Sequence, residues 1–88
     1  MKLVKTAMAG SLESNDVLVT VMPIENKTEI EVQSIVKSQF GDKIESVIIE
    51  TLKRLKVENV SVKVQDRGAL DCVLEARIET AVLRGGIK

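Results

Sequence analysis

The chain has 88 residues, with 13 basic and 13 acidic side chains, and we expect one domain over residues 1–88. This charge balance provides no overall positive field, which argues against nucleic-acid binding. The single cysteine, Cys72, cannot form an internal disulfide, and the N-terminal sequence lacks an apolar stretch long enough for a secretory signal or a membrane span, so we expect a cytoplasmic protein.

The first predicted elements are two strands joined by a tight turn. Residues 6–13 alternate weakly in polarity, and residues 16–24 form a near-continuous apolar run that the only proline, Pro23, ends. The turn would lie at Ser14, Asn15 and Asp16, because these residue types bond their own backbone, and Asn and Asp tolerate the left-handed conformation. We therefore expect a hairpin with Ser14 exposed at its tip.

A third strand and a helix are expected next. Residues 28–34 alternate in polarity and predict a strand with Ile30 and Val32 pointing inward. From Asp42 the apolar residues recur with a helical period, so we expect Asp42 to cap a helix and Gly41 to end what precedes it. The expected core face of this helix comprises Ile44, Val47, Ile48, Thr51, Leu52 and Leu55.

A fourth strand and a second helix complete the prediction. Residues 59–66 alternate in polarity with the valines Val60, Val62 and Val64 inward, and residues 69–84 predict a helix that two glycines end. The expected core residues of this helix are Leu70, Val73, Leu74, Ile78 and Ala81. The expected fold class is therefore α+β: a small single-layer sheet of about four strands that starts with a hairpin, with two amphipathic helices packed on one face.

The second predicted helix has another stripe of side chains outside its core face. At about 100° per residue, small and weakly polar side chains share one side of it. They are Ala69, Cys72, Ala76, Thr80 and Leu83. The stripe has two interpretations: ordinary helix surface, or a contact surface for a partner subunit, because small residues permit close approach.

The composition argues against catalysis by this chain. Serine and cysteine nucleophiles of the common arrangements need a histidine base, and the chain contains no histidine. Nothing near Ser14 specifies a lysine activated by desolvation. One cysteine without histidine leaves carboxylates as metal ligands, and these show no recognisable loop spacing. We therefore expect no catalytic residue and no metal site.

Three segments carry a resemblance to a known family. They are "GSLESNDV", "QFGD" and "DRGALDCVLEARIE", in this order along the chain. Together they resemble the acyl carrier protein, or gamma subunit, of citrate lyase. The resemblance implies that Ser14 carries phosphoribosyl-dephospho-CoA through a phosphodiester bond, as a phosphoprotein of citrate fermentation. The thiol of this prosthetic group would hold acetyl and citryl groups during the cleavage of citrate to acetate and oxaloacetate.

The resemblance also implies partners. The alpha subunit of citrate lyase would exchange acetyl for citrate, the beta subunit would cleave the citryl thioester, and a loading enzyme would attach the prosthetic group. Because the prosthetic precursor is polyanionic, Glu13 and Asp16 beside Ser14 cannot serve to attract it. We expect these carboxylates to orient the hairpin tip toward a basic surface on the loading enzyme or the catalytic subunits.

Two other functions stay open at this point. One is the carrier subunit of citramalate lyase, because the carrier sequence contains no substrate pocket that would separate the two lyases. The other is a noncatalytic protein-binding subunit with no prosthetic group, which would use the two-faced second helix as its interface. Taken alone, Ser14 would be an ordinary turn serine.

Overall fold

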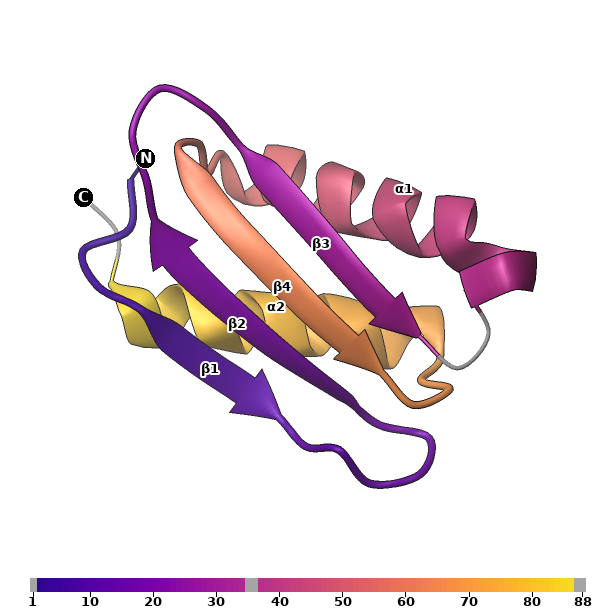
Figure 1. Cartoon of the computed structure of the whole chain (residues 1–88). Coiled ribbons are helices and arrows are strands. Elements are labelled where there is room, and N and C mark those ends of the chain that lie inside the picture. The colour runs from indigo at the N-terminus through magenta and orange to yellow at the C-terminus, as the bar shows by residue number, and fades with distance from the viewer. Residues whose placement is uncertain (1, 35–36, 87–88) are drawn as a thin grey trace.

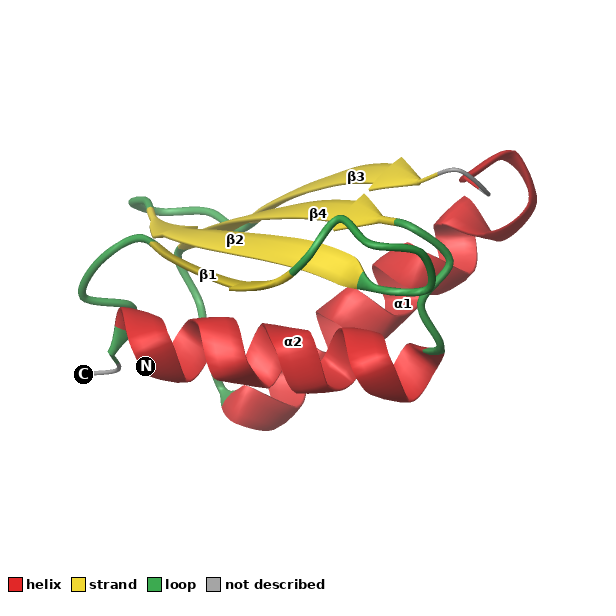
Figure 2. Ribbon diagram, turned by 90° about the horizontal axis from the view of Figure 1, so that it is seen from below, coloured by secondary structure: helices red, strands yellow, loops and turns green. Residues whose placement is uncertain are grey.

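The computed structural model describes residues 2–34 and 37–86, which form one sheet and two helices. The elements in chain order are β1 (Ala7–Gly10), β2 (Val17–Pro23), β3 (Glu29–Ser34), α1 (Lys37–Leu55), β4 (Val60–Asp66) and α2 (Asp71–Gly85). The four strands are ordered β1-β2-β4-β3 in the sheet (Figure 1). Both helices cover the same face of the sheet (Figure 2). The α+β fold class expected from the sequence, with its opening hairpin, is confirmed. The predicted extent of the first strand is wrong, because β1 ends at Gly10 and residues 11–13 belong to the connecting loop.

The sheet is mixed, with β2 and β4 at its centre. β2 pairs antiparallel with both β1 and β4, whereas β3 pairs parallel with β4. A parallel pair needs a long crossover connection, and α1 is the crossover between β3 and β4. This order places the loop between β1 and β2 beside the connection that leads from β4 into α2 (Figure 1).

The core lies between the sheet and the helices and is aliphatic. The central strands contribute six valines that are 0% exposed: Val17, Val19, Val21, Val60, Val62 and Val64. The helices add Ile48 and Ile78, which are also fully buried. The strand periodicity and the predicted core face of the first helix are therefore confirmed, including Thr51, whose hydroxyl donates to the Val47 carbonyl at 2.7 Å.

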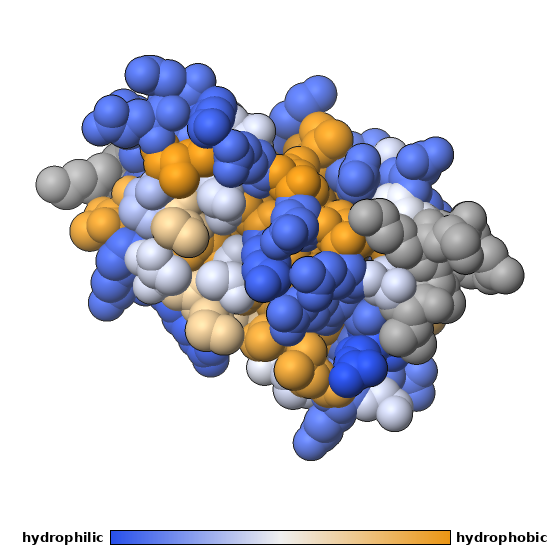
Figure 3. Space-filling model, viewed as in Figure 1, coloured by the Kyte–Doolittle hydropathy of each residue, from blue (hydrophilic) through white to orange (hydrophobic). Residues whose placement is uncertain are grey.

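Neither α1 nor α2 lies over the opposite face of the sheet (Figure 2). Apolar and polar side chains are mixed across this open face (Figure 3). Met8 on β1 and Met22 on β2 are each about half exposed there. The open face also includes the side chains that alternate with the buried valines, because successive residues of a strand point to opposite faces.

The start of the first helix differs from the prediction. α1 begins at Lys37 and continues through Gly41 and Asp42, so the prediction that Asp42 caps the helix and that Gly41 ends the preceding element is wrong. One internal glycine costs a helix only about 1 kcal/mol, which the packing of the rest of the helix offsets. Ile35 and Val36, which follow the predicted third strand, lie outside the described residues.

The start of the second helix also differs. α2 begins at Asp71, so Leu70 precedes it, and the Leu70 side chain is 71% exposed instead of lying in the core as predicted. The helical period holds only for residues that have the helical conformation. The Leu70 carbonyl accepts hydrogen bonds from the amides of Val73 and Leu74 in the first turn. The predicted glycine ending is confirmed, because Gly86 caps the helix with a φ of 74°.

The N-terminal segment is bonded to the C-terminal end of α2. The amides of Val4 and Lys5 donate to the Gly85 carbonyl at 3.2 and 3.1 Å, and the Val4 amide also lies 3.0 Å from the Gly86 carbonyl. A side chain at position 85 would meet Leu3 and the Lys5 carbonyl, so glycine permits this close approach. The two ends therefore meet at the end of the molecule away from the loop between β1 and β2 (Figure 1).

Candidate functional site: the Ser14 loop

Ser14 lies in residues 11–16, the loop that joins β1 to β2; we call this segment the Ser14 loop. Its side chain is exposed, as the turn chemistry predicted. The next residue, Asn15, has a φ of 63°, the left-handed conformation that asparagine tolerates better than most residues. The exposed hydroxyl is thus on a turn of defined shape.

Backbone hydrogen bonds hold the Ser14 loop against the turn that follows β4. The Asn15 amide donates to the Arg67 carbonyl at 2.8 Å, and the Arg67 amide donates to the Asp16 carbonyl at 2.9 Å. These two bonds continue the β2–β4 ladder past its last strand pair, Val17 with Asp66. Ser14 is therefore the immediate neighbour of a residue fixed to the central part of the sheet.

Asp16 fixes the loop through its carboxylate. The Ser11 hydroxyl donates to Oδ2 at 2.6 Å, and the Val17 amide donates to Oδ1 at 2.7 Å. The Arg77 guanidinium on α2 binds both oxygens, with Nε to Oδ1 and Nη2 to Oδ2 each 3.1 Å. The hydroxyl of Ser11, the Val17 amide and Arg77, in that order of effect, lower the pKa of Asp16 from 3.8 to about 2.

The two carboxylates expected to dock a partner have different environments. The Asp16 side chain is only 16% exposed and is bonded within the chain, whereas Glu13 is exposed. The Glu13 carboxylate makes no ion pair within residues 2–34 and 37–86. Docking by these residues stays a prediction. Asp16 also holds the Ser14 loop in place, a structural role that the sequence did not reveal.

Gly10 is required where β1 enters the loop. Its φ of 98° lies in the region that favours glycine, and a Cβ there would collide with the Val17 carbonyl oxygen. That same oxygen accepts the Ser11 amide at 3.2 Å. The absence of a side chain thus allows the two strands to close on each other at the base of the Ser14 loop.

A second polar cluster surrounds Asp66 at the end of β4. This side chain is buried, and its oxygens accept hydrogen bonds from the Ser34 hydroxyl at 2.8 Å and the Ala69 amide at 3.0 Å. Sequence reasoning missed Asp66, although the same alternation that placed Val64 inward also places Asp66 inward. Asp66 therefore joins the end of β3 to the turn before α2.

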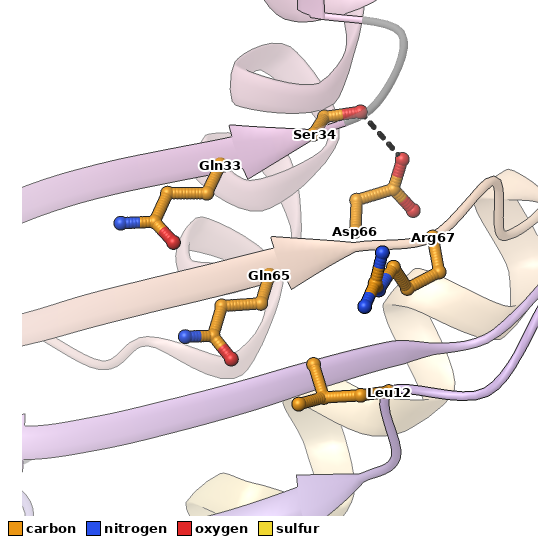
Figure 4. Close-up of a pocket in the computed structure, with 6 residues that line it drawn as sticks. All are labelled: Leu12, Gln33, Ser34, Gln65, Asp66 and Arg67. Atoms are coloured by element: carbon orange, nitrogen blue, oxygen red, sulfur yellow. Dashed lines mark hydrogen bonds between the residues drawn. The ribbon is translucent and has the colours of Figure 1, made fainter.

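A shallow hollow of about 380 Å³ lies beside this cluster (Figure 4). Its lining residues come from the Ser14 loop, β3, β4 and the following turn. They are Leu12, Gln33, Ser34, Gln65, Asp66 and Arg67. Within the described ranges, no three histidine, cysteine, aspartate or glutamate side chains are grouped to hold a metal ion.

The small-residue stripe lies mostly on exposed surface. Cys72, Ala76 and Leu83 are exposed, and Thr80 is half-buried with its hydroxyl 2.9 Å from the Ala76 carbonyl. Ala69 precedes α2 and packs against the core. The four helical members are therefore accessible to a partner, and the proposed subunit contact stays a prediction. No described helix has the length and apolar character needed to cross a membrane.

The fold has a counterpart among solved structures. A chain in the crystal structure of a Pseudomonas malonate decarboxylase hetero-tetramer in complex with malonate matches with a TM-score of 0.81 at 19% identity. The match covers 98% of this chain and 89% of that chain. A Thermus thermophilus structure matches with a TM-score of 0.68 at 15% identity, over 94% of this chain and 16% of that chain. At these identities the likeness shows the fold.

Sequence comparisons define the family. Residues 4–85 match the family model described as the malonate decarboxylase delta subunit, an acyl carrier protein. Citrate lyase acyl carrier protein 2 of Salmonella paratyphi A is 49% identical over 96% of this chain and 88% of its own length. The citrate lyase acyl carrier protein of Clostridium perfringens is 52% identical over 96% of this chain and 84% of its own length. The chain belongs to this acyl carrier protein family, which confirms the resemblance drawn from its sequence.

Proposed function

We propose that this chain is the covalent acyl carrier subunit of citrate lyase and that Ser14 is the attachment site. The prosthetic group would be phosphoribosyl-dephospho-CoA, joined to the Ser14 hydroxyl through a phosphodiester bond. The observation that carries the proposal is the exposure of Ser14 on a loop held by Asp16, Arg77 and the backbone of Arg67. Relatives at 49% and 52% identity that are named citrate lyase acyl carrier proteins support the choice of lyase.

The residues around Ser14 fit such a group. An attachment site needs an accessible hydroxyl on a stable projection, and the anchored loop provides both. The Arg67 side chain is exposed and makes no ion pair within the described residues, so its guanidinium is available to a phosphate. When bound, the prosthetic group would supply the thiol that carries acyl groups as thioesters. The chain itself supplies the hydroxyl and the geometry that presents it.

The carrier is noncatalytic in this proposal. The chain has no histidine to act as a general base, and the Asp16 carboxylate is engaged by Ser11, Val17 and Arg77. The acyl exchange and the cleavage would therefore be carried out by the alpha and beta subunits, and the attachment by a loading enzyme. The hetero-tetramer formed by malonate decarboxylase supports a carrier of this fold that works with other subunits.

The attachment site can be tested by intact mass. We expect wild-type protein produced with the loading enzymes to gain the mass of the prosthetic group, and Ser14→Ala to gain nothing. The variant should keep its fold, because substitutions at exposed positions change stability by only about 0.5 kcal/mol. Ser46→Ala, at an exposed serine of α1 outside the loop, is the matched control and should still be loaded. The added mass on Ser14→Ala would overturn the assignment.

The choice of lyase needs a separate assay. Loaded and acetylated carrier combined with the alpha and beta subunits should form oxaloacetate from citrate and give no product from citramalate or malonate. Turnover of citramalate instead would identify this chain as the carrier subunit of citramalate lyase. Turnover of malonate would favour the activity named in the family description.

A further inference from the structure

The hollow beside the Ser14 loop has a lining suited to a polar ligand. It opens on the face of the sheet that neither α1 nor α2 covers, where β3 and β4 end (Figure 4). Gln33 and Gln65 are directly paired in the parallel β3–β4 register, and their side chains extend in the same direction, away from the strand ends at Ser34 and Asp66 (Figure 4). Within residues 2–34 and 37–86 neither carboxamide has a hydrogen-bond partner, so both can donate to and accept from a ligand.

The hollow has one side chain that can bind an anion near the Ser14 loop. Arg67 is the only cation among the six lining residues, and it has no ion-pair partner in the described part of the chain. Asp66 is the only acid in the lining, but hydrogen bonds from Ser34 and Ala69 engage both of its oxygens. The side chain left to interact with a charged ligand is therefore the guanidinium.

The hollow is also next to the proposed attachment point. Leu12, which lines it, is two residues from Ser14 in the same loop. Arg67 also lines the hollow, and its carbonyl accepts a hydrogen bond at 2.8 Å from the amide of Asn15, the residue after Ser14. A group esterified to Ser14 would thus begin in the same loop that contributes Leu12 to the lining of the hollow.

We propose that this hollow is a resting site for the prosthetic group between its visits to the catalytic subunits. Arg67 binds a phosphate of the group, and Gln33 and Gln65 exchange hydrogen bonds with its amides or hydroxyls. Because the group is tethered beside the site, even weak contacts hold it there, since the effective concentration of a tethered ligand is high. This proposal rests on the attachment to Ser14 proposed above.

NMR spectra of ¹⁵N-labelled protein before and after loading test the resting site without an activity assay. In loaded wild-type protein we expect the side-chain amide signals of Gln33 and Gln65 and the Nε–H signal of Arg67 to shift. Arg67→Gln keeps the backbone bonds of the turn but removes the charge, and it should lose the shifts at both glutamines while intact mass shows loading. Lys63→Gln is the matched control, because it removes a cation from the same face of β4 outside the hollow and should keep the shifts.

The outcomes separate this proposal from the proposed function. No added mass on wild-type protein would overturn the attachment and the resting site together. Added mass with shifts confined to the Ser14 loop would leave the attachment standing and overturn the resting site, as would unchanged glutamine shifts in loaded Arg67→Gln. If Arg67→Gln is not loaded, Gln65→Ala decides, because it leaves the arginine in place for the loading enzyme. Loaded Gln65→Ala should show smaller shifts at Gln33 and Arg67, and unchanged shifts would overturn the resting site.

Discussion

A single carboxylate shapes the Ser14 loop at the scale of residues. Asp16 accepts hydrogen bonds from its own loop, from the start of β2 and from α2. Charge-assisted bonds of this kind are stronger than neutral ones, and the bidentate arginine contact adds geometric specificity. Asp16 therefore links the position of the exposed hydroxyl to the positions of the core elements.

The lowered pKa of Asp16 predicts a pH-dependent stability. Folding favours the charged form of Asp16. The stability that this carboxylate contributes is therefore present above pH 3.8 and is lost as the pH falls toward about 2. Asp16→Asn should be less stable than wild-type protein at pH 7, and the gap should close over this interval in urea unfolding measured at several pH values. Arg77→Gln protein should keep part of this pH-dependent stability, because the bonds from Ser11 and Val17 to Asp16 remain. A gap that is the same at pH 7 and pH 2 would contradict this account.

Glu13 can now be tested separately from its neighbour. Glu13→Gln removes an exposed charge without disturbing the bonds of Asp16. If Glu13 faces a basic surface on the loading enzyme, the initial loading rate should fall and depend less on salt, because exposed charges act mainly on encounter and are screened by salt. Initial rates at low and high salt check this. Faster loading of the variant would reject the docking role.

Local chemistry predicted part of this site from the sequence. The turn preferences of Ser14, Asn15 and Asp16 correctly gave an exposed serine and a left-handed asparagine. The contact between Asp16 and Arg77 joins residues 61 positions apart, and no local pattern specifies such a pair. The burial of Asp66 could have been predicted, because this residue continues the alternation of the buried valines in β4.

At the scale of elements, α2 presents one side to the core and another to solvent. Ala76 is exposed, so Ala76→Arg should change the stability of the isolated domain by only about 0.5 kcal/mol. If the stripe contacts a subunit, the larger side chain should weaken assembly with the alpha and beta subunits far more. Ser46→Arg, at an exposed small residue of α1, is the matched control and should assemble normally. Urea unfolding and size-exclusion chromatography on the same preparations check both effects.

Two results would count against this interface. Normal assembly of Ala76→Arg would make the stripe ordinary helix surface. Unfolding of the isolated variant would mean that Ala76 contributes to the fold itself.

Helix interiors were easier to predict than helix ends. The period of 3.6 residues correctly placed Ile48 in α1 and Ile78 in α2 in the core, because burial of one face imposes that period. The ends depend on weaker preferences. Gly41 and Asp42 resemble a boundary but lie within α1, and Leu70 fits the period of α2 but precedes its first turn.

At the scale of the whole molecule, stability depends on the aliphatic core. Ile48 is fully buried and its neighbour Ile49 is 41% exposed, so the two residues provide a matched pair. Ile48→Ala should lower the free energy of unfolding by about 2–5 kcal/mol, because it removes buried methyl groups and leaves a cavity. Ile49→Ala should cost much less. Urea unfolding checks both variants, and equal losses would contradict the observed packing.

The overall architecture followed from the sequence, but the strand order did not. Alternation and helical period identify each element, whereas the order β1-β2-β4-β3 depends on pairing between distant segments. The hollow beside the Ser14 loop depends on that order as well, because Gln33 and Gln65 meet only in the β3–β4 register. Such a site could not be predicted without the register.

The bonds from Val4 and Lys5 to Gly85 have a practical consequence. They hold both ends of the described chain together, at the end of the molecule away from Ser14 (Figure 1). An affinity tag or fluorescent protein fused at either end would therefore leave the Ser14 loop unobstructed. A carrier immobilised through such a tag would present this loop to solution, which suits direct capture of the enzymes that act on it.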